Sequence, residues 1–178
     1  MTSKRSGGFS FIELIVTIVM MGVLSAVAVT SISAKAQHSV TVQADQFRSD
    51  LSHLQLLAIS QGVRLKLTVA STATGYSVYC AVDVTLPCPP STATPITDPA
   101  TGAPFSVTLT DGVRFLTGTG TSGPGNYYFD SLGRPVSTAT TAALVTGTTT
   151  FSLNGVGRAT AVDVTVLPIT GFAQTNYH

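Results

Sequence analysis

One apolar segment near the start of the chain limits what the chain can fold into. Phe9 to Ala28 is a run of 20 residues in which Glu13 is the only charged side chain. At about 1.5 Å of rise per residue, a helix of this length matches the roughly 30 Å hydrocarbon core of a bilayer. No charged residue occurs from Leu14 to Ala34. The segment therefore predicts one membrane-spanning helix.

The residues before this segment indicate on which side of the membrane the rest of the chain lies. Lys4 and Arg5 precede it, and no acidic residue does. By the positive-inside rule this short flank stays in the cytoplasm, so the residues after the helix lie outside. An ordinary secretory signal cut after Ala26–Ala28 and an uncleaved anchor are the alternatives. The apolar segment passes straight into a helical pattern, as a retained helix would.

The helical pattern continues beyond the apolar segment. Apolar residues recur there at alternating spacings of four and three, at Val40, Ala44, Phe47, Leu51, Leu54 and Ala58. This periodicity is typical of an amphipathic helix with one buried face. Gly62 is a natural stop signal, so we expect one helix from Phe9 to Ser60.

After Gly62 the period changes to two, which indicates half-buried strands. Arg64–Val69 alternates cleanly, and the further candidates are Gly75–Val82, Phe105–Leu109, Val113–Phe115, Tyr127–Phe129, Thr149–Leu153 and Ala161–Leu167. Clusters of Gly, Pro, Ser and Thr separate them, and Pro87–Pro104 is expected to be an exposed loop. The expected fold class is α+β, with an antiparallel sheet wrapped on the second half of a long helix.

The chain has two cysteines, Cys80 and Cys88, separated by seven residues. If the domain lies outside the cytoplasm, a disulfide between them is plausible and would close a small loop worth about 2–3 kcal/mol. Two unrelated thiols are the alternative. No Cys-x-x-Cys or paired His accompanies them, so zinc is not expected, and neither is any other metal or cofactor.

The first residues of the apolar segment carry a specific motif. Gly8-Phe9-Ser10-Phe11-Ile12-Glu13-Leu14 resembles the cleavage and methylation motif of type IV pilins and type II secretion pseudopilins. The resemblance implies that a prepilin peptidase cuts between Gly8 and Phe9 on the cytoplasmic side. It also implies that the same peptidase/methyltransferase methylates the new amine of Phe9.

Glu13 has a physical explanation within this family. A carboxylate inside a membrane helix costs about 2.5–3.5 kcal/mol or more unless it finds a partner. Glu13 follows Phe9 by about one helical turn, and the amine of a neighbouring subunit could neutralise it during assembly. This is the family's usual account of assembly. The alternative is a glutamate at the membrane edge that reaches for water.

A finer resemblance concerns the end of the helix. Residues 50–63, running into Leu65–Leu67, resemble the H-type pseudopilin and FimT-like minor pilin group. Tyr128–Arg134 and Gly155–Arg158 resemble Gly-Arg-bearing hairpins of that group, although these motifs are less specific than the one at the start.

Several functions are not expected. The charge is near zero, with 9 basic and 8 acidic residues, so there is no general electrostatic case for nucleic-acid binding. Arg114, Arg134 and Arg158 are far apart in sequence, and DNA binding is not expected unless they converge in space. Gly118–Gly123 matches a dinucleotide fingerprint only by its letters, and a flexible loop is the preferred interpretation. His38, His53 and His178 are scattered, and we expect them simply to be solvated. Enzyme activity is not predicted.

The sequence therefore predicts a leader at residues 1–8, a transmembrane helix at 9–30, a periplasmic half-helix at 31–62 and a periplasmic β-rich domain at 63–178. The expected protein is a minor pseudopilin of a type II secretion system in the inner membrane. Its partners would be the prepilin peptidase and other pseudopilins or pilins. The alternatives are a minor pilin of a type IV pilus and, more distantly, a single-pass membrane-tethered binding protein.

Overall fold

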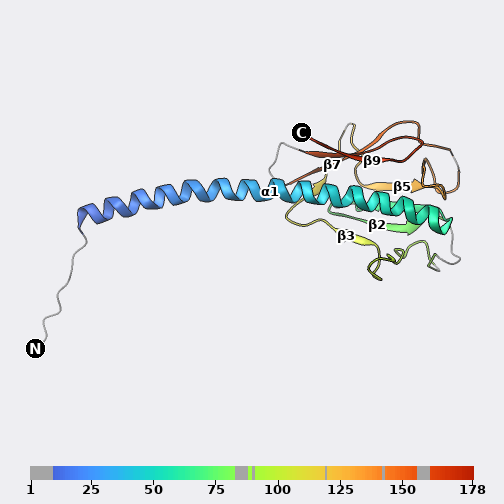
Figure 1. Ribbon diagram of the computed structural model, residues 1–178, viewed down its shortest axis with the longest axis horizontal. Coiled ribbons are helices and arrows are strands. Elements are labelled where there is room, and N and C mark those ends of the chain that lie inside the picture. The colour runs from blue at the N-terminus through green and yellow to red at the C-terminus, as the bar shows by residue number, and fades with distance from the viewer. Residues whose placement is uncertain (1–9, 83–87, 90, 119, 142, 156–160) are drawn as a thin grey trace, which may run out of the picture. The chain divides into compact units, whose positions relative to one another are not determined.

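The computed structural model describes residues 10–82, 88–89, 91–118, 120–141, 143–155 and 161–178, with residues 26–37 described by their helical backbone (Figure 1). Its elements are α1 (Phe11–Gln61), β1 (Leu65–Val69), β2 (Gly75–Cys80), β3 (Ser106–Thr108), β4 (Arg114–Phe115), β5 (Gly125–Phe129), β6 (Pro135–Val136), β7 (Thr149–Asn154), β8 (Val162–Val166) and β9 (Ala173–Tyr177). The chain divides into two compact units, residues 1–37 and residues 38–178, and α1 contributes to both.

The bounds of α1 follow from local hydrogen bonds. At its start, the backbone N–H groups of Glu13 and Leu14 donate to the carbonyl of Ser10 at 3.0 and 3.2 Å. At its end, Gly62 takes a φ of 67°, a left-handed conformation that suits glycine and stops the helix. The predicted helix is confirmed to within one residue at this end. The predicted first residue, Phe9, lies outside the described residues.

The strands form two antiparallel sheets, whereas the sequence predicted one. The first sheet has the order β3-β2-β1-β5-β6 and the second the order β4-β7-β8-β9. Figure 1 shows β2 and β3 along one side of the second half of α1 and β7 and β9 along the other. The part of α1 from His38 to Gln61, called the half-helix below, has a wide buried face, and two sheets are needed to cover it. Phe47 alone contacts rings from both sheets.

All seven predicted strands are present, and two strands were missed. β6 has only two residues and begins with Pro135, which hides any alternation. β9 is polar, and its side chains meet α1 through hydrogen bonds: the hydroxyl of Tyr177 donates to Asp45 Oδ1 at 2.8 Å. Apolar periodicity cannot reveal a strand that packs in this way.

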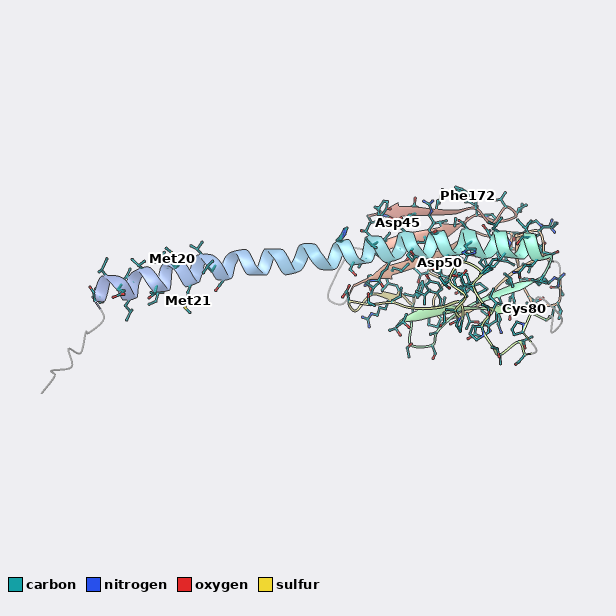
Figure 2. The ribbon with its side chains drawn as sticks, turned by 60° about the horizontal axis from the view of Figure 1, so that its bottom comes forward. Met20, Met21, Asp45, Asp50, Cys80 and Phe172 are labelled. Atoms are coloured by element: carbon teal, nitrogen blue, oxygen red, sulfur yellow. A yellow bond between two sulfur atoms is a disulfide. The ribbon has the colours of Figure 1, made fainter. Side chains whose placement is uncertain are left out.

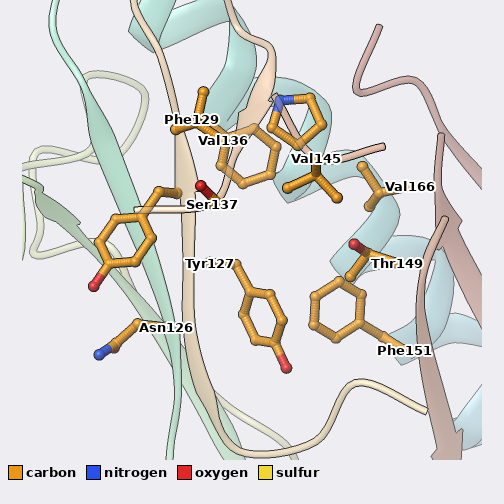
Figure 3. Close-up of a pocket in the computed structure, with 11 residues that line it drawn as sticks. Asn126, Tyr127, Phe129, Val136, Ser137, Val145, Thr149, Phe151 and Val166 are labelled. Carbon is orange, nitrogen blue, oxygen red and sulfur yellow. The ribbon is translucent and has the colours of Figure 1, made fainter. Parts of the chain in front are cut away.

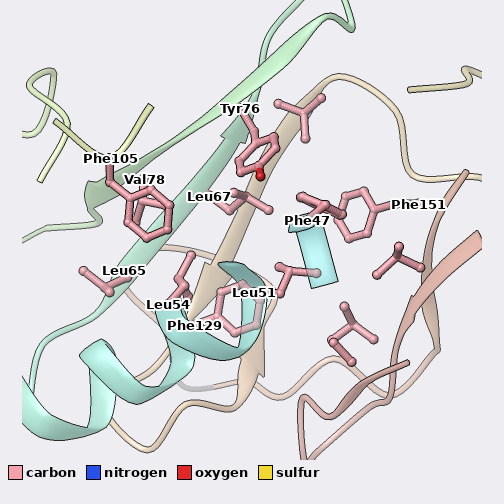
Figure 4. Close-up of a cluster of buried hydrophobic side chains, with 14 of the residues drawn as sticks. Phe47, Leu51, Leu54, Leu65, Leu67, Tyr76, Val78, Phe105, Phe129 and Phe151 are labelled. Carbon is pink, nitrogen blue, oxygen red and sulfur yellow. The ribbon is translucent and has the colours of Figure 1, made fainter. Parts of the chain in front are cut away.

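The core lies between the half-helix and both sheets (Figure 4). Phe47 is fully buried at its centre. Its ring stands edge-on to those of Tyr76, Phe115 and Phe151, with centroids 4.8, 5.0 and 5.1 Å away. Edge-to-face pairs of this kind add about 0.5–1.5 kcal/mol each beyond the burial of apolar area. One helical residue therefore joins the two sheets.

The expected exposed loop from Pro87 to Pro104 is partly packed, so that prediction was only partly right. Cys88 and Ile96 are buried. The backbone N–H of Ile96 donates to the carbonyl of Val78 at 2.9 Å. The carbonyl of Ile96 accepts a hydrogen bond from the N–H of Phe105 at 2.7 Å. The segment returns along the edge of β2, because these hydrogen bonds satisfy backbone groups there. Pro87 and Pro90 lie outside the described residues.

The turn between β5 and β6 is built on an ion pair between buried Asp130 and partly exposed Arg134. Asp130 Oδ2 accepts from Arg134 Nε and Nη2 at 2.9 and 2.7 Å, and Oδ1 accepts from the backbone N–H groups of Leu132 and Arg134. Burial by itself raises the pKa of the Asp130 carboxyl. The hydrogen bonds from Arg134 and Leu132 outweigh burial and hold this pKa below its ordinary value of 3.8.

We predict that Phe47→Ala lowers the free energy of unfolding by about 3–5 kcal/mol, because it leaves a cavity between both sheets. Urea unfolding followed by circular dichroism measures this. Val42→Ala is the control, since Val42 lies on the same helix and is 51% exposed. Its expected effect is below about 0.5 kcal/mol. Equal effects of the two substitutions would contradict the proposed role of Phe47.

We predict that Asp130→Asn destabilises the protein by about 1–3 kcal/mol at neutral pH, because it removes the acceptor charge of the turn. The lowered pKa means that the ionised carboxyl stabilises the fold above pH 3.8. This contribution is lost as the pH falls below 3.8 through the folded-state pKa. The difference between wild type and variant should therefore shrink in that range, which urea unfolding at several pH values measures. A difference that stays constant down to pH 2 would refute this account.

Candidate functional site

The first described turns of α1 present an apolar surface with one carboxylate. Every described side chain from Ser10 to Ser25 is exposed, and the exposed fraction reaches 80% at Phe11 and 73% at Met21. Glu13 lies in the first turn. A carboxylate there is favoured by the partial positive charge of a helix N-terminus. Figure 2 draws these side chains, with Met20 and Met21 labelled.

The other predicted processing residues, Gly8 and Phe9, lie outside the described residues, so the structure does not test cleavage or methylation. Glu13 is the predicted assembly residue that the structure places. Among the residues that the structure describes, no helix has both the length and the apolar character needed to cross a membrane.

Cys80 and Cys88 are joined by a disulfide, with their Cα atoms 6.0 Å apart. Both side chains are almost fully buried. Cys80 ends β2, and Cys88 begins the segment that returns along β2 to Ile96. The bond therefore fixes the start of this segment against the first sheet.

A cavity of about 130 Å³ is lined by residues of β5 and β6 from the first sheet and of β7 and β8 from the second (Figure 3). Tyr127 and Phe151 form one wall, with ring centroids 4.7 Å apart, and Val136, Val145 and Val166 line the rest. In Figure 3 Asn126 and Tyr127 point to opposite sides of β5. The lining contains no carboxylate, histidine, cysteine, lysine or arginine. Its polar lining residues are Asn126, Tyr127, Tyr128, Ser137 and Thr149, so no carboxylate or imidazole base stands beside a hydroxyl in this lining.

Titratable side chains gather where α1 meets β2 and the returning segment. The hydroxyl of Tyr76 donates to Asp50 Oδ2 at 2.5 Å, and His53 Nε2 lies 3.8 Å from Asp98 Oδ1. Burial raises the pKa of the Asp50 carboxyl, although hydrogen bonds from Tyr76 and Gln46 partly offset it. Burial and the nearby Asp50 raise the pKa of the Tyr76 phenol. These contacts attach the helix to the first sheet.

This arrangement is not a metal site. In the described part of the chain, no three His, Cys, Asp or Glu side chains converge in a way that could hold a metal ion. The expectation that His53 is simply solvated was incomplete, because its ring also packs against Phe105 with centroids 5.7 Å apart. His178 lies 3.1 Å from Asp163.

The arginines considered for DNA binding do not form a described cluster. Arg114 is exposed on β4, and Arg134 is bound to Asp130 in the β5–β6 turn. Arg158 lies outside the described residues. Two of the three arginines therefore occupy different surroundings, and one of those two already has an anionic partner.

Sequence reasoning missed an exposed apolar cluster that we call the hairpin-tip patch. It consists of Leu56, Ile59, Leu132, Ile169 and Phe172, each more than half exposed. Leu56 and Ile59 are three residues apart on α1, off the buried stripe, and this spacing was the available signal. The other three lie in turns whose mutual position no local pattern indicates.

Residues 3–29 match the family model described as the prokaryotic N-terminal methylation motif. No curated protein sequence matches the chain.

Two solved structures are similar to this one. The minor pseudopilin EpsH from the type 2 secretion system of Vibrio cholerae is 14% identical, with a TM-score of 0.50 over 78% of this chain and 97% of EpsH. The type IV minor pilin FimU of Pseudomonas aeruginosa is 11% identical, with a TM-score of 0.48 over 80% of this chain and 90% of FimU. The methylation motif at the start of the chain and the fold that follows it confirm the resemblance to type IV pilins and pseudopilins, and the fold of the chain is pilin-like.

Proposed function

We propose that the chain is a minor pseudopilin subunit of a type II secretion system. It is made as a precursor, cut between Gly8 and Phe9, methylated at Phe9 and assembled into a short periplasmic filament that drives protein export. The observation that carries this proposal is the methylation motif at residues 3–29, joined to a fold that spans 97% of a known minor pseudopilin.

The proposed subunit has one membrane anchor. Residues 9–30 cross the inner membrane before assembly, and residues 31–62 and 63–178 lie in the periplasm. The apolar side chains that cover the first turns of α1 support this arrangement, since they have no partner among the described residues of the chain. The disulfide between Cys80 and Cys88 is consistent with an oxidising compartment.

Assembly rests on Glu13 in this proposal. Its carboxylate is exposed in the first turn of α1 and finds no partner there among the described residues. In lipid such a charge costs about 2.5–3.5 kcal/mol. The amine that cleavage creates at Phe9 of a neighbouring subunit compensates this charge, so that docking by the helix becomes favourable. The function is mechanical, and no catalytic group is assigned.

A minor pilin of a type IV pilus is the second candidate. The N-terminal motif supports it equally well, because pili and pseudopili use the same anchor. Deleting the gene separates the two systems: a pseudopilin mutant loses protein export, whereas a pilin mutant loses surface pili. A membrane-tethered binding protein would leave both unchanged.

We predict that the mature protein begins with N-methylated Phe9. Intact-mass and N-terminal peptide mass spectrometry of the protein from membranes measures this. A Gly8→Glu variant should retain its leader, with or without Met1, because a bulky, charged residue replaces the small one before the cut. A mature protein that begins after Ala28, or one that keeps its first eight residues in the wild type, would refute the proposal.

We predict that Glu13→Gln lowers incorporation into filaments at least tenfold, because the amide cannot neutralise the neighbouring amine. A lost compensation of about 1.4 kcal/mol already gives that factor. Quantitative immunoblotting of sheared filaments against membrane-bound subunit measures it. Asp111→Asn is the matched control, since it makes the same chemical change in an exposed loop of the globular unit. If the Glu13→Gln variant entered filaments as well as the wild type, the proposed compensation of Glu13 by a neighbouring amine would be wrong.

A further inference from the structure

The hairpin-tip patch gathers around one junction of the globular unit. The turn after β5 and the turn after β8 both end against the last turns of α1. Gln55 Nε2 donates to the carbonyls of Gly133 and Gly171, at 3.0 and 2.7 Å. A Cβ at Gly133 would lie 3.0 Å from Ile59 Cδ1, so this turn packs directly on the helix. Three segments distant in sequence therefore meet at one amide.

The apolar members of the patch surround this junction. Leu132 precedes Gly133, Phe172 follows Gly171, and Leu56 follows Gln55. Their exposed fractions are 61%, 60% and 62%. In Figure 2 Phe172 lies at the outside of the globular unit. The side chains point outward although the backbone beneath them is firmly held.

Ile169 shows that the exposure has an energetic cost. Its φ is 67°, in the left-handed region, and its side chain is 56% exposed. A β-branched residue is strained there, and glycine would adopt the same conformation freely. The turn's hydrogen bonds are made by backbone groups and by Thr170, so none of them depends on the Ile169 side chain. Strain of this kind concentrates at sites that contact other molecules.

The charge and size of the patch indicate the class of its partner. Within two positions of its members, the only charged residues are Asp130 and Arg134, which neutralise each other. Five such side chains expose roughly 500 Å² of apolar surface, near the upper end for a single patch on a monomer. A stable interface between freely diffusing proteins needs about 800 Å² per partner. The patch is too small to hold a free partner, but it suits one that is already held nearby.

We propose that the hairpin-tip patch is the docking surface for the globular part of a neighbouring pilin-like subunit in the assembled filament. The inference rests on the proposed function, which supplies a partner kept close by its own N-terminal helix. The partner surface is apolar and uncharged, because the patch offers no group to neutralise a charge. Docking there extends the contact between subunits beyond their N-terminal helices.

Site-specific photocrosslinking in cells that carry the filament machinery tests this proposal. Benzoylphenylalanine replaces Phe172 in the full chain, and the matched control position is Asn126, an exposed residue of β5 that is not part of the patch. We expect a crosslink from position 172 to the globular part of a pilin-like subunit, identified by peptide mass spectrometry, and at least tenfold less from position 126. The crosslink should fall at least tenfold with Glu13→Gln, in step with the lower incorporation into filaments.

Other results would overturn the proposal. The first is a crosslink from position 172 to lipid, and the second is a crosslinked dimer that persists with Glu13→Gln. The third is the absence of a crosslink from a chain that still enters filaments. In the last case the proposed function stands and only the docking surface fails. If the wild-type chain never enters filaments, both the proposed function and the proposed docking surface are wrong.

Ile169→Gly provides a second readout that does not depend on the probe. It relieves the backbone strain, so the Tm should stay equal or rise, whereas the crosslink from position 172 should fall at least threefold. A fall in Tm, or an unchanged crosslink, would show that Ile169 serves the fold alone.

Discussion

The burial of Phe47 is the contact on which the globular unit depends. A helix alone cannot remove an aromatic ring from water on all sides, and a single sheet would cover only part of it. The ring meets Tyr76 from the first sheet and Phe115 and Phe151 from the second. Each sheet is therefore positioned by its contact with the helix, and the cavity beside Tyr127 lies between residues of the first sheet and residues of the second.

Polar contacts fix what apolar burial leaves free. Asp50 binds Tyr76 of β2, Asp45 binds Tyr177 of β9, and Gln55 binds the turns at Gly133 and Gly171. Apolar packing is not directional, so a helix could slide along its sheets with little change in buried area. Hydrogen bonds at both ends of the half-helix set its position along the sheets.

Much of the fold could be predicted from the sequence, because its local patterns are strong. The stripe from Val40 to Ala58 is buried as its spacing indicated, and all seven predicted strands are present. The division into two sheets could not be predicted, since alternation shows which face of a strand is buried but not which strand lies beside it. For the candidate site, the motif indicated Glu13, whereas the hairpin-tip patch arises from turns that only the tertiary fold brings together.

Gln55 makes three separate positions depend on one another. Its Nε2 donates to two carbonyl oxygens, so an ionised glutamate would have no proton to donate to them, and asparagine would be one carbon too short to reach both. A side chain at Gly171 would also collide with this amide, whose Nε2 lies 2.1 Å from the place a Cβ would occupy. During divergence, Gln55, Gly133 and Gly171 should therefore be inherited or lost as a group. Where another sequence has all three residues at equivalent positions, we expect the same two turns to pack against the end of its long helix.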